Sequence, residues 1–385
     1  MRQGHVVRLC CLVHALLVAV PSATAEEFYY PSAAADWERR SPEAVGIDPE
    51  KLAEAVKFAQ DHEVNWSRDL RAQIEKDVAH EPFPGVLGEA KERGGPAGLV
   101  LRHGYEIAQW GDVERVDMSF SVAKSYLSTV AGLAVDRGLI KDVRDPVWKY
   151  IHDGGFDSAH NTGITWHMLL NQTSEWEGTL WGKPDIADRR KGYDRKLQEP
   201  GTFWEYNDVR MNRLALALLR VWKKPLPGVL KDEVMDPIGA SSTWVWHGYR
   251  NSYVELNGRA VQSVSGGSHW GGGLWASTRD HARFGLLFLR KGEWNGRRIV
   301  SERWVRMATT PTDIAPHYGY LWWLNTGRQI LPSVPASSFF ALGSGGNVIW
   351  IDPDHDMVVV TRWLEFGALD GFAQRVVGAV KDVKR

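Results

Sequence analysis

Strand-like hydrophobic runs lie near both ends of the chain, and helix-like spacing fills much of the stretch between them. Apolar runs on either side of His103 and Gly104 predict a β-hairpin over residues 98–110, with glycine supplying the positive φ that the turn needs. Two more strands are predicted at residues 348–351 and 357–361, joined by a turn rich in Asp and Pro. These runs predict the sheet of the molecule.

Three stretches have the periodicity of helices. The spacing predicts one helix at residues 51–63, a second that begins at Ser121 and ends near Gly138, and a third at the end of the chain. The apolar face of the second helix is formed by Ala123, Leu127, Val130 and Ala134. That of the third is formed by Phe372, Val376 and Val380. This order predicts an α+β fold whose sheet is built from both chain ends and flanked by helices, with a mainly helical lobe inserted at about residues 142–253.

The composition narrows the functional class. The chain has 385 residues, 24% of them charged, and a formal net charge of −1. This is an ordinary globular composition without the basic excess of a nucleic-acid-binding protein, so no nucleic-acid partner is expected. Nineteen tryptophans are many. Such side chains either fill a core or line an aromatic cleft, and both interpretations stay open at this point.

The first 25 residues have the pattern of a secretory signal peptide. A positively charged start precedes an apolar stretch too short to span a bilayer comfortably, and an Ala-x-Ala cleavage signal ends at Ala25. We expect an exported, periplasmic or extracellular protein that begins at Glu26 and does not enter a membrane; an uncleaved anchor is the alternative. Both cysteines, Cys10 and Cys11, lie in the segment to be removed, so the mature chain is expected to lack disulfides.

Ser121 and Lys124 form the S-x-x-K motif of the chain. Ser121 stands where the predicted helix begins, and Lys124 lies one turn later over the same face. A serine hydroxyl becomes a good nucleophile when a neighbouring base takes its proton, and a buried lysine with a lowered pKa can be that base. A capping serine beside a solvated lysine gives the same four letters. Four letters alone therefore leave both interpretations open.

Other catalytic motifs are missing from the sequence. The pairs His62-Glu63 and His80-Glu81 begin like H-E-x-x-H, but Trp66 and Pro84 stand where the second histidine would be. There is neither a G-x-S-x-G elbow nor a phosphate-binding glycine loop. We therefore expect no metal and no cofactor.

Five segments, in order, resemble the serine β-lactamase-related family, which includes class C β-lactamases, D-Ala-D-Ala carboxypeptidases, carboxylesterases and 6-aminohexanoate-dimer hydrolases. They are residues 118–146, 164–174, 200–208, 271–280 and 351–359. The resemblance covers about Gly98 to Thr361. It implies a β-lactamase/transpeptidase-like fold with an antiparallel sheet, and Ser121 as the nucleophile with Lys124 as its general base.

The same resemblance assigns further residues. In the segment Pro200–Asp208, Tyr206 matches the family's tyrosine, which relays a proton to the leaving group. Asp208 stands where many relatives have Asn, and its charge would tend to keep Lys124 protonated. The family's Lys-Thr-Gly element is replaced by Ala341-Leu342-Gly343. By position, the Ser344 N–H would then join the Ser121 N–H in the oxyanion hole.

The expected activity is hydrolysis of small esters or linear amides, of the esterase or 6-aminohexanoate-dimer hydrolase type. Leu342, Gly343, Asp208 and Trp270 are candidate site-lining residues, and an apolar wall is expected from Trp270, Trp322 and Trp323. The alternatives are a D-amino-acid peptidase or β-lactamase, with a cation supplied by Arg250, Arg328 or Arg362, and a catalytically silent protein that binds a ligand or the cell wall.

Overall fold

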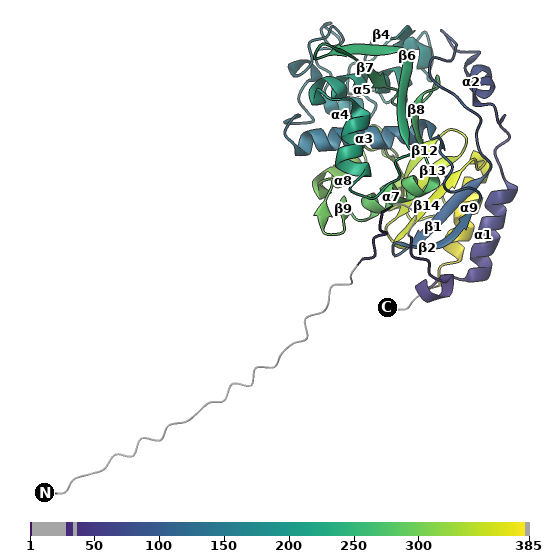
Figure 1. Cartoon of the computed structure of the whole chain (residues 1–385). Coiled ribbons are helices and arrows are strands. Elements are labelled where there is room, and N and C mark those ends of the chain that lie inside the picture. The colour runs from purple at the N-terminus through teal and green to yellow at the C-terminus, as the bar shows by residue number, and fades with distance from the viewer. Residues whose placement is uncertain (2–27, 34–36, 382–385) are drawn as a thin grey trace.

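The computed structural model describes Met1, residues 28–33 and residues 37–381 (Figure 1). Apart from Met1, the predicted signal peptide lies outside the described residues. Within the described ranges, no helix combines the length and the apolar character that a bilayer crossing requires.

A six-stranded sheet has the order β11-β12-β13-β14-β1-β2, and every neighbouring pair in it is antiparallel. Its strands are β1 (Ala97–Arg102), β2 (Tyr105–Trp110), β11 (Trp323–Leu324), β12 (Phe339–Gly343), β13 (Asn347–Asp352) and β14 (Met357–Arg362). The predicted hairpin is β1–β2, and its turn residues His103 and Gly104 both have positive φ, 54° and 87°. The predicted antiparallel sheet from both chain ends is confirmed.

Helices cover both faces of this sheet. On one face α1 (Pro49–Asp61) and α9 (Leu369–Gly378) pack together, and α7 (Thr278–Leu289) lies on the other face (Figure 1). Strand β14 contributes side chains to both faces of the sheet. Val358 and Val360 belong to the main core, while Met357 and Val359 belong to the core beneath α1 and α9. Alternation along the strand sends successive side chains to opposite faces, so a continuous apolar run is needed here.

A second lobe lies beside the sheet domain, at the top of the view in Figure 1. It holds the buried helix α3 (Ala123–Asp136), α4 (Trp166–Leu170), α5 (Asp208–Trp222) and α6 (Leu226–Leu230). A four-stranded sheet, β3-β8-β6-β7, completes it with β3 (Asp117–Met118), β6 (Val245–Leu256), β7 (Arg259–Val264) and β8 (Gly273–Ala276). The structure thus has strand β6 where the helical lobe was expected to continue to about residue 253. Polar residues interrupt the apolar pattern of β6, so the strand does not stand out in the sequence.

Shorter elements join these parts. They are α2 (Leu70–Val78), α8 (Glu302–Ala308), the hairpins β4 (Thr179–Leu180) with β5 (Lys183–Pro184) and β9 (Glu293–Trp294) with β10 (Arg297–Arg298), the 3₁₀ turns η1 (Pro42–Val45), η2 (Phe120–Val122), η3 (Val147–Lys149), η4 (Asp185–Asp188), η6 (Thr326–Arg328) and η7 (Phe366–Ala368), and the π-helical turn η5 (Lys231–Met235).

Candidate active site

Ser121 lies in the 3₁₀ turn η2, directly before α3, at the junction of the two lobes. The residue before it, Phe120, has φ 48°, an uncommon conformation for a bulky side chain that the packing of its ring against Trp66 and Trp363 maintains. Lys124 occupies the first turn of α3, so its side chain reaches back over Ser121. Its Nζ donates a hydrogen bond to Ser121 Oγ at 2.9 Å.

A buried ion pair joins Lys124 to the start of α5. Lys124 Nζ lies 2.9 Å from Asp208 Oδ1, and both side chains are only 1% exposed. The second carboxylate oxygen of Asp208 lies 3.3 Å from Arg190 Nη2. Asp188 accepts the Asp208 backbone N–H at 2.6 Å and also pairs with Arg190. Asp208 therefore points at Lys124, where its charge can act on the lysine as expected from the sequence.

Each member of this pair favours the charged form of the other. Burial lowers the pKa of Lys124, and the Asp208 carboxylate raises it again without fully restoring it. Burial raises the pKa of Asp208, but the positive charges of Lys124, His269 and Arg190 outweigh burial and leave it below its usual range. Asp208 is therefore ionised at neutral pH, and it holds on Lys124 a proton that burial alone would tend to remove.

Tyr206 lies directly beside this pair. Its ring centroid is 4.5 Å from Lys124 Nζ and 4.9 Å from the Arg190 guanidinium carbon. Burial and the Asp208 carboxylate raise the pKa of the Tyr206 hydroxyl, and a hydrogen bond with Ser121 opposes that rise. The phenol is thus a proton-carrying group in contact with the serine hydroxyl.

Gln172 fixes the backbone on both sides of Tyr206. Its carbonyl accepts the Glu205 N–H at 3.1 Å, and its side-chain oxygen accepts the Asn207 N–H at 2.8 Å. Asn207 also caps α5, because its side chain accepts the Arg210 N–H. The position of Tyr206 is therefore set by backbone contacts rather than by its hydroxyl.

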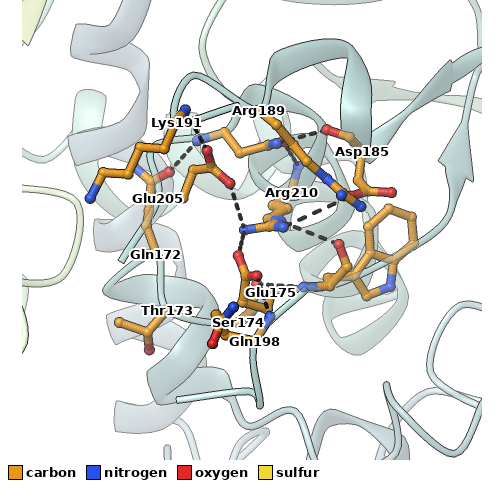
Figure 2. A network of polar contacts seen from close by, with 12 residues as sticks. Gln172, Thr173, Ser174, Glu175, Asp185, Arg189, Lys191, Gln198, Glu205 and Arg210 are labelled. Carbon is orange, nitrogen blue, oxygen red and sulfur yellow. Dashed lines mark hydrogen bonds and ion pairs between the residues drawn. The ribbon is translucent and has the colours of Figure 1, made fainter. Parts of the chain in front are cut away.

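Figure 2 shows the buried ionic network below this segment. Arg195 pairs with both Glu205 and Glu175, and Arg210 lies 2.8 Å from Glu175. Burial would raise the pKa of Glu175, but Arg195 and Arg210 hold it at about 2. Glu205 also accepts the Lys191 backbone N–H at 2.9 Å. The network thus ties the Tyr206 segment to the chain around Lys191, and its carboxylates Glu175 and Glu205 are each paired with an arginine.

The end of strand β12 meets the turn that carries Ser121. A Cβ at Gly343 would lie 2.3 Å from the Ser119 carbonyl oxygen, so only glycine lets the strand approach so closely. Ser344 follows and lines the same cavity as Ser121. The contact brings together two chain segments more than 200 residues apart.

A cavity of about 710 Å³ opens above these groups. Its apolar lining consists of Trp66, Trp204, Trp323, Ile330, Leu342 and Phe366. Two cationic side chains, Arg190 and Lys191, also line it. A mainly apolar cavity with a few convergent polar groups is typical of small-molecule sites.

The structure brings together most of the residues expected from the sequence. Ser121, Lys124, Tyr206 and Asp208 contact one another, and Leu342, Gly343 and Ser344 line the cavity beside them.

The tryptophan wall differs from the expectation. Trp270 does not line the cavity, because its side chain is fully buried and packs against Tyr249 and Lys183. Trp322 is likewise buried, against Phe288, whereas Trp323 does line the cavity. The many tryptophans therefore serve both purposes, the core and the cleft.

Sequence reasoning missed several lining residues. Trp204 stands two positions before Tyr206 in a family-like segment, and this proximity could have identified it as a lining residue. Trp66 comes from the charged stretch before β1, and Arg190 and Lys191 from an irregular loop, where no pattern pointed to the site. Two of the three cations named in advance are engaged elsewhere: Arg362 is buried and donates to the Met118 and Ala276 carbonyls, and Arg250 donates to the Val86 carbonyl. The third, Arg328, is not among the residues that line the cavity.

One group near the site has the donor atoms of a metal site. Ligand atoms of Glu81, Asp188 and His269 lie within 4.8 Å of one another. They already partner each other and their neighbours, since His269 Nε2 contacts Glu81 at 2.7 Å and Asp188 pairs with Arg190. The Arg190 charge opposes a second cation on the same carboxylate. The arrangement links Glu81 to the Lys124–Asp208 pair.

Comparison with known proteins finds matches over most of the chain. The Beta-lactamase family model matches residues 92–363. An uncharacterised protein of Alkalihalophilus pseudofirmus is 28% identical over 276 residues, which cover 66% of this chain and 74% of that protein.

Two solved structures share the fold at low identity. One, named "Putative 6-aminohexanoate-dimer hydrolase" from Bacillus anthracis, has a TM-score of 0.56 and 17% identity, covering 84% of this chain and 93% of that one. The D-stereospecific amidohydrolase from Streptomyces has a TM-score of 0.51 and 16% identity, covering 81% and 98%. At such identities the likeness shows the fold alone.

Proposed function

Since this chain belongs to the Beta-lactamase family, we propose that it is a serine hydrolase that forms an acyl-enzyme at Ser121. The observation that carries the proposal is the hydrogen bond of 2.9 Å from Lys124 Nζ to Ser121 Oγ, beside the Tyr206 phenol. A catalytically silent protein would have no need of this buried, charged constellation.

In the proposed acylation, the neutral amine of Lys124 takes the Ser121 proton while Oγ attacks the substrate carbonyl carbon. The bond to the leaving group then breaks, and Tyr206 gives its proton to the leaving atom and receives one from Lys124. Water attacks the acyl-enzyme by the reverse route and releases the acid. The backbone N–H groups of Ser121 and Ser344 are proposed to stabilise the oxyanion, a role for which no particular side chain is needed.

The proposed substrates are small esters or linear amides. Six apolar side chains line the cavity, and the β12 segment Ala341–Gly343 that borders it carries no cation. A substrate carboxylate next to that strand would lose its hydration without gaining a charged partner.

We therefore expect clear turnover of short-chain p-nitrophenyl esters and very weak turnover of nitrocefin. Measuring kcat/KM for both on one preparation tests the substrate class. Nitrocefin turnover as fast as ester turnover would instead favour the β-lactamase alternative.

We also propose export, on the strength of the charged start, the apolar stretch and the Ala-x-Ala signal in residues 1–25. N-terminal sequencing of the protein produced by its natural host should give Glu26 as the first residue. A mature chain that retains Met1 would contradict the prediction.

A further inference from the structure

The charges around the cavity balance one another at every lining residue but one. Arg190 lies 2.8 Å from Asp188 and 3.3 Å from Asp208. Glu205 is paired with Arg195. Lys191 differs, because its side chain is exposed and no described carboxylate forms an ion pair with it. The described part of the cavity lining thus carries one uncompensated positive charge.

The backbone and the aromatic neighbours of Lys191 hold this charge in place. Its N–H donates to the buried carboxylate of Glu205. Its Nζ lies 4.9 Å from the ring centroid of Phe203 and 5.1 Å from that of Trp204. Trp204 in turn packs edge to face with Trp323 and lies 6.4 Å from Tyr206, centroid to centroid. The ammonium therefore stands past Tyr206, over an aromatic surface that continues from the catalytic phenol.

We propose that Lys191 binds a carboxylate carried by the leaving group of a linear amide or ester substrate. This inference rests on the proposed function, in which Tyr206 protonates the leaving atom. The leaving group must then lie on the Tyr206 side of the cavity, and a straight-chain arm over Tyr206 and Trp204 leads to Lys191. The remaining apolar lining, which includes Trp66, Ile330 and Leu342, is then available to the acyl part.

Arm length separates these substrates from penicillins. A penicillin carboxylate is attached to the atom next to the ring nitrogen, so it stays close to the scissile bond and does not extend over Trp204 to Lys191. The other cation that lines the cavity, Arg190, is already paired with Asp188 and Asp208. A carboxylate several bonds from the scissile group reaches the unpaired ammonium instead. Charge-assisted hydrogen bonds of this kind are among the stronger polar contacts.

The test compares two substrates that differ only in charge. Release of hexanoate from N-hexanoyl-5-aminopentanoate and from N-hexanoyl-5-aminopentanamide is measured by liquid chromatography. We expect the wild-type kcat/KM to favour the carboxylate roughly tenfold. In Lys191→Gln the ratio of the two kcat/KM values should fall to about one, and Lys191→Arg should keep the preference. Lys196→Gln, an exposed lysine on the same loop but outside the cavity, is the matched control and should behave as wild type.

The outcomes separate this inference from the proposed function. A carboxylate preference that is the same in wild type and Lys191→Gln would overturn the assignment of Lys191 and leave the hydrolase function standing, and so would wild-type turnover with no preference at all. If the wild type hydrolysed neither the two amides nor p-nitrophenyl esters, the hydrolase function would be overturned, and this inference with it.

Discussion

Replacing Ser121 with Ala is expected to lower kcat by at least about 10³-fold and to abolish covalent labelling by a fluorophosphonate. The Ser121 oxygen is the atom that forms the acyl bond, and among the serines of the described chain it is the one that hydrogen-bonds to Lys124. Thermal stability should change only modestly, because the side chain is partly exposed and its loss removes the hydrogen bonds with Lys124 and Tyr206, each worth about 1 kcal/mol. Turnover, peptide mass spectrometry of the labelled protein and thermal melting together check the prediction.

Two other serines serve as controls. Ser344 also lines the cavity, so Ser344→Ala should keep the label, since the proposed role of this residue uses its backbone N–H. Ser125 lies one residue after Lys124, but its hydroxyl is buried and donates to the Leu321 carbonyl. If Ser344→Ala or Ser125→Ala removed the label while Ser121→Ala kept it, the nucleophile would have been assigned to the wrong serine.

The sheet could be predicted from the sequence, whereas parts of the second lobe could not. Strands β13 and β14 are continuous apolar runs because both of their faces are buried, and such runs stand out. Strand β6 has one largely exposed face and polar residues at irregular positions, so its hydrophobic pattern resembles that of a loop. The residues before β6 have a helix-like pattern, and without a clear strand signal in β6 the predicted helical lobe extends into it.

For the site, local motifs were informative and long-range packing was not. Lys124 reaches Ser121 because one helical turn separates them, a relation fixed by the backbone alone. Trp66 and Lys191 reach the same cavity from loops, through tertiary contacts that no spacing encodes. Trp270 illustrates the opposite error, since a tryptophan directly before the family-like segment 271–280 is fully buried rather than exposed in the cleft.

Replacing Lys124 with Arg is expected to inactivate the enzyme as completely as Lys124→Ala, by roughly 10²- to 10⁴-fold, the range of general-base catalysis. Arginine keeps the positive charge beside Asp208 but does not give up its proton at working pH. Ester turnover at several pH values, with circular dichroism as a check on folding, measures the effect. Substantial activity in Lys124→Arg would mean that the residue acts as a fixed charge and that another group takes the serine proton.

The buried pair makes the pH profile a second measurement of the same assignment. A general base works when deprotonated, so kcat/KM should rise with pH through the pKa of Lys124. The Asp208 charge raises that pKa, and Asp208→Asn should therefore move the acidic limb to lower pH. Asp188→Asn is the matched control, because Asp188 pairs with Arg190 but makes no direct contact with Lys124. It should move the limb less.

The Asp208 variant also leaves Lys124 and Arg190 without their shared carboxylate, so it should unfold at a lower temperature than wild type. The pH profile is informative despite that loss, since it reports only molecules that remain folded and active. An acidic limb that stays in place, or that moves to higher pH, would contradict Lys124 as the base. In that case the ion pair would be a structural support for Tyr206, and the phenol itself would have to accept the serine proton.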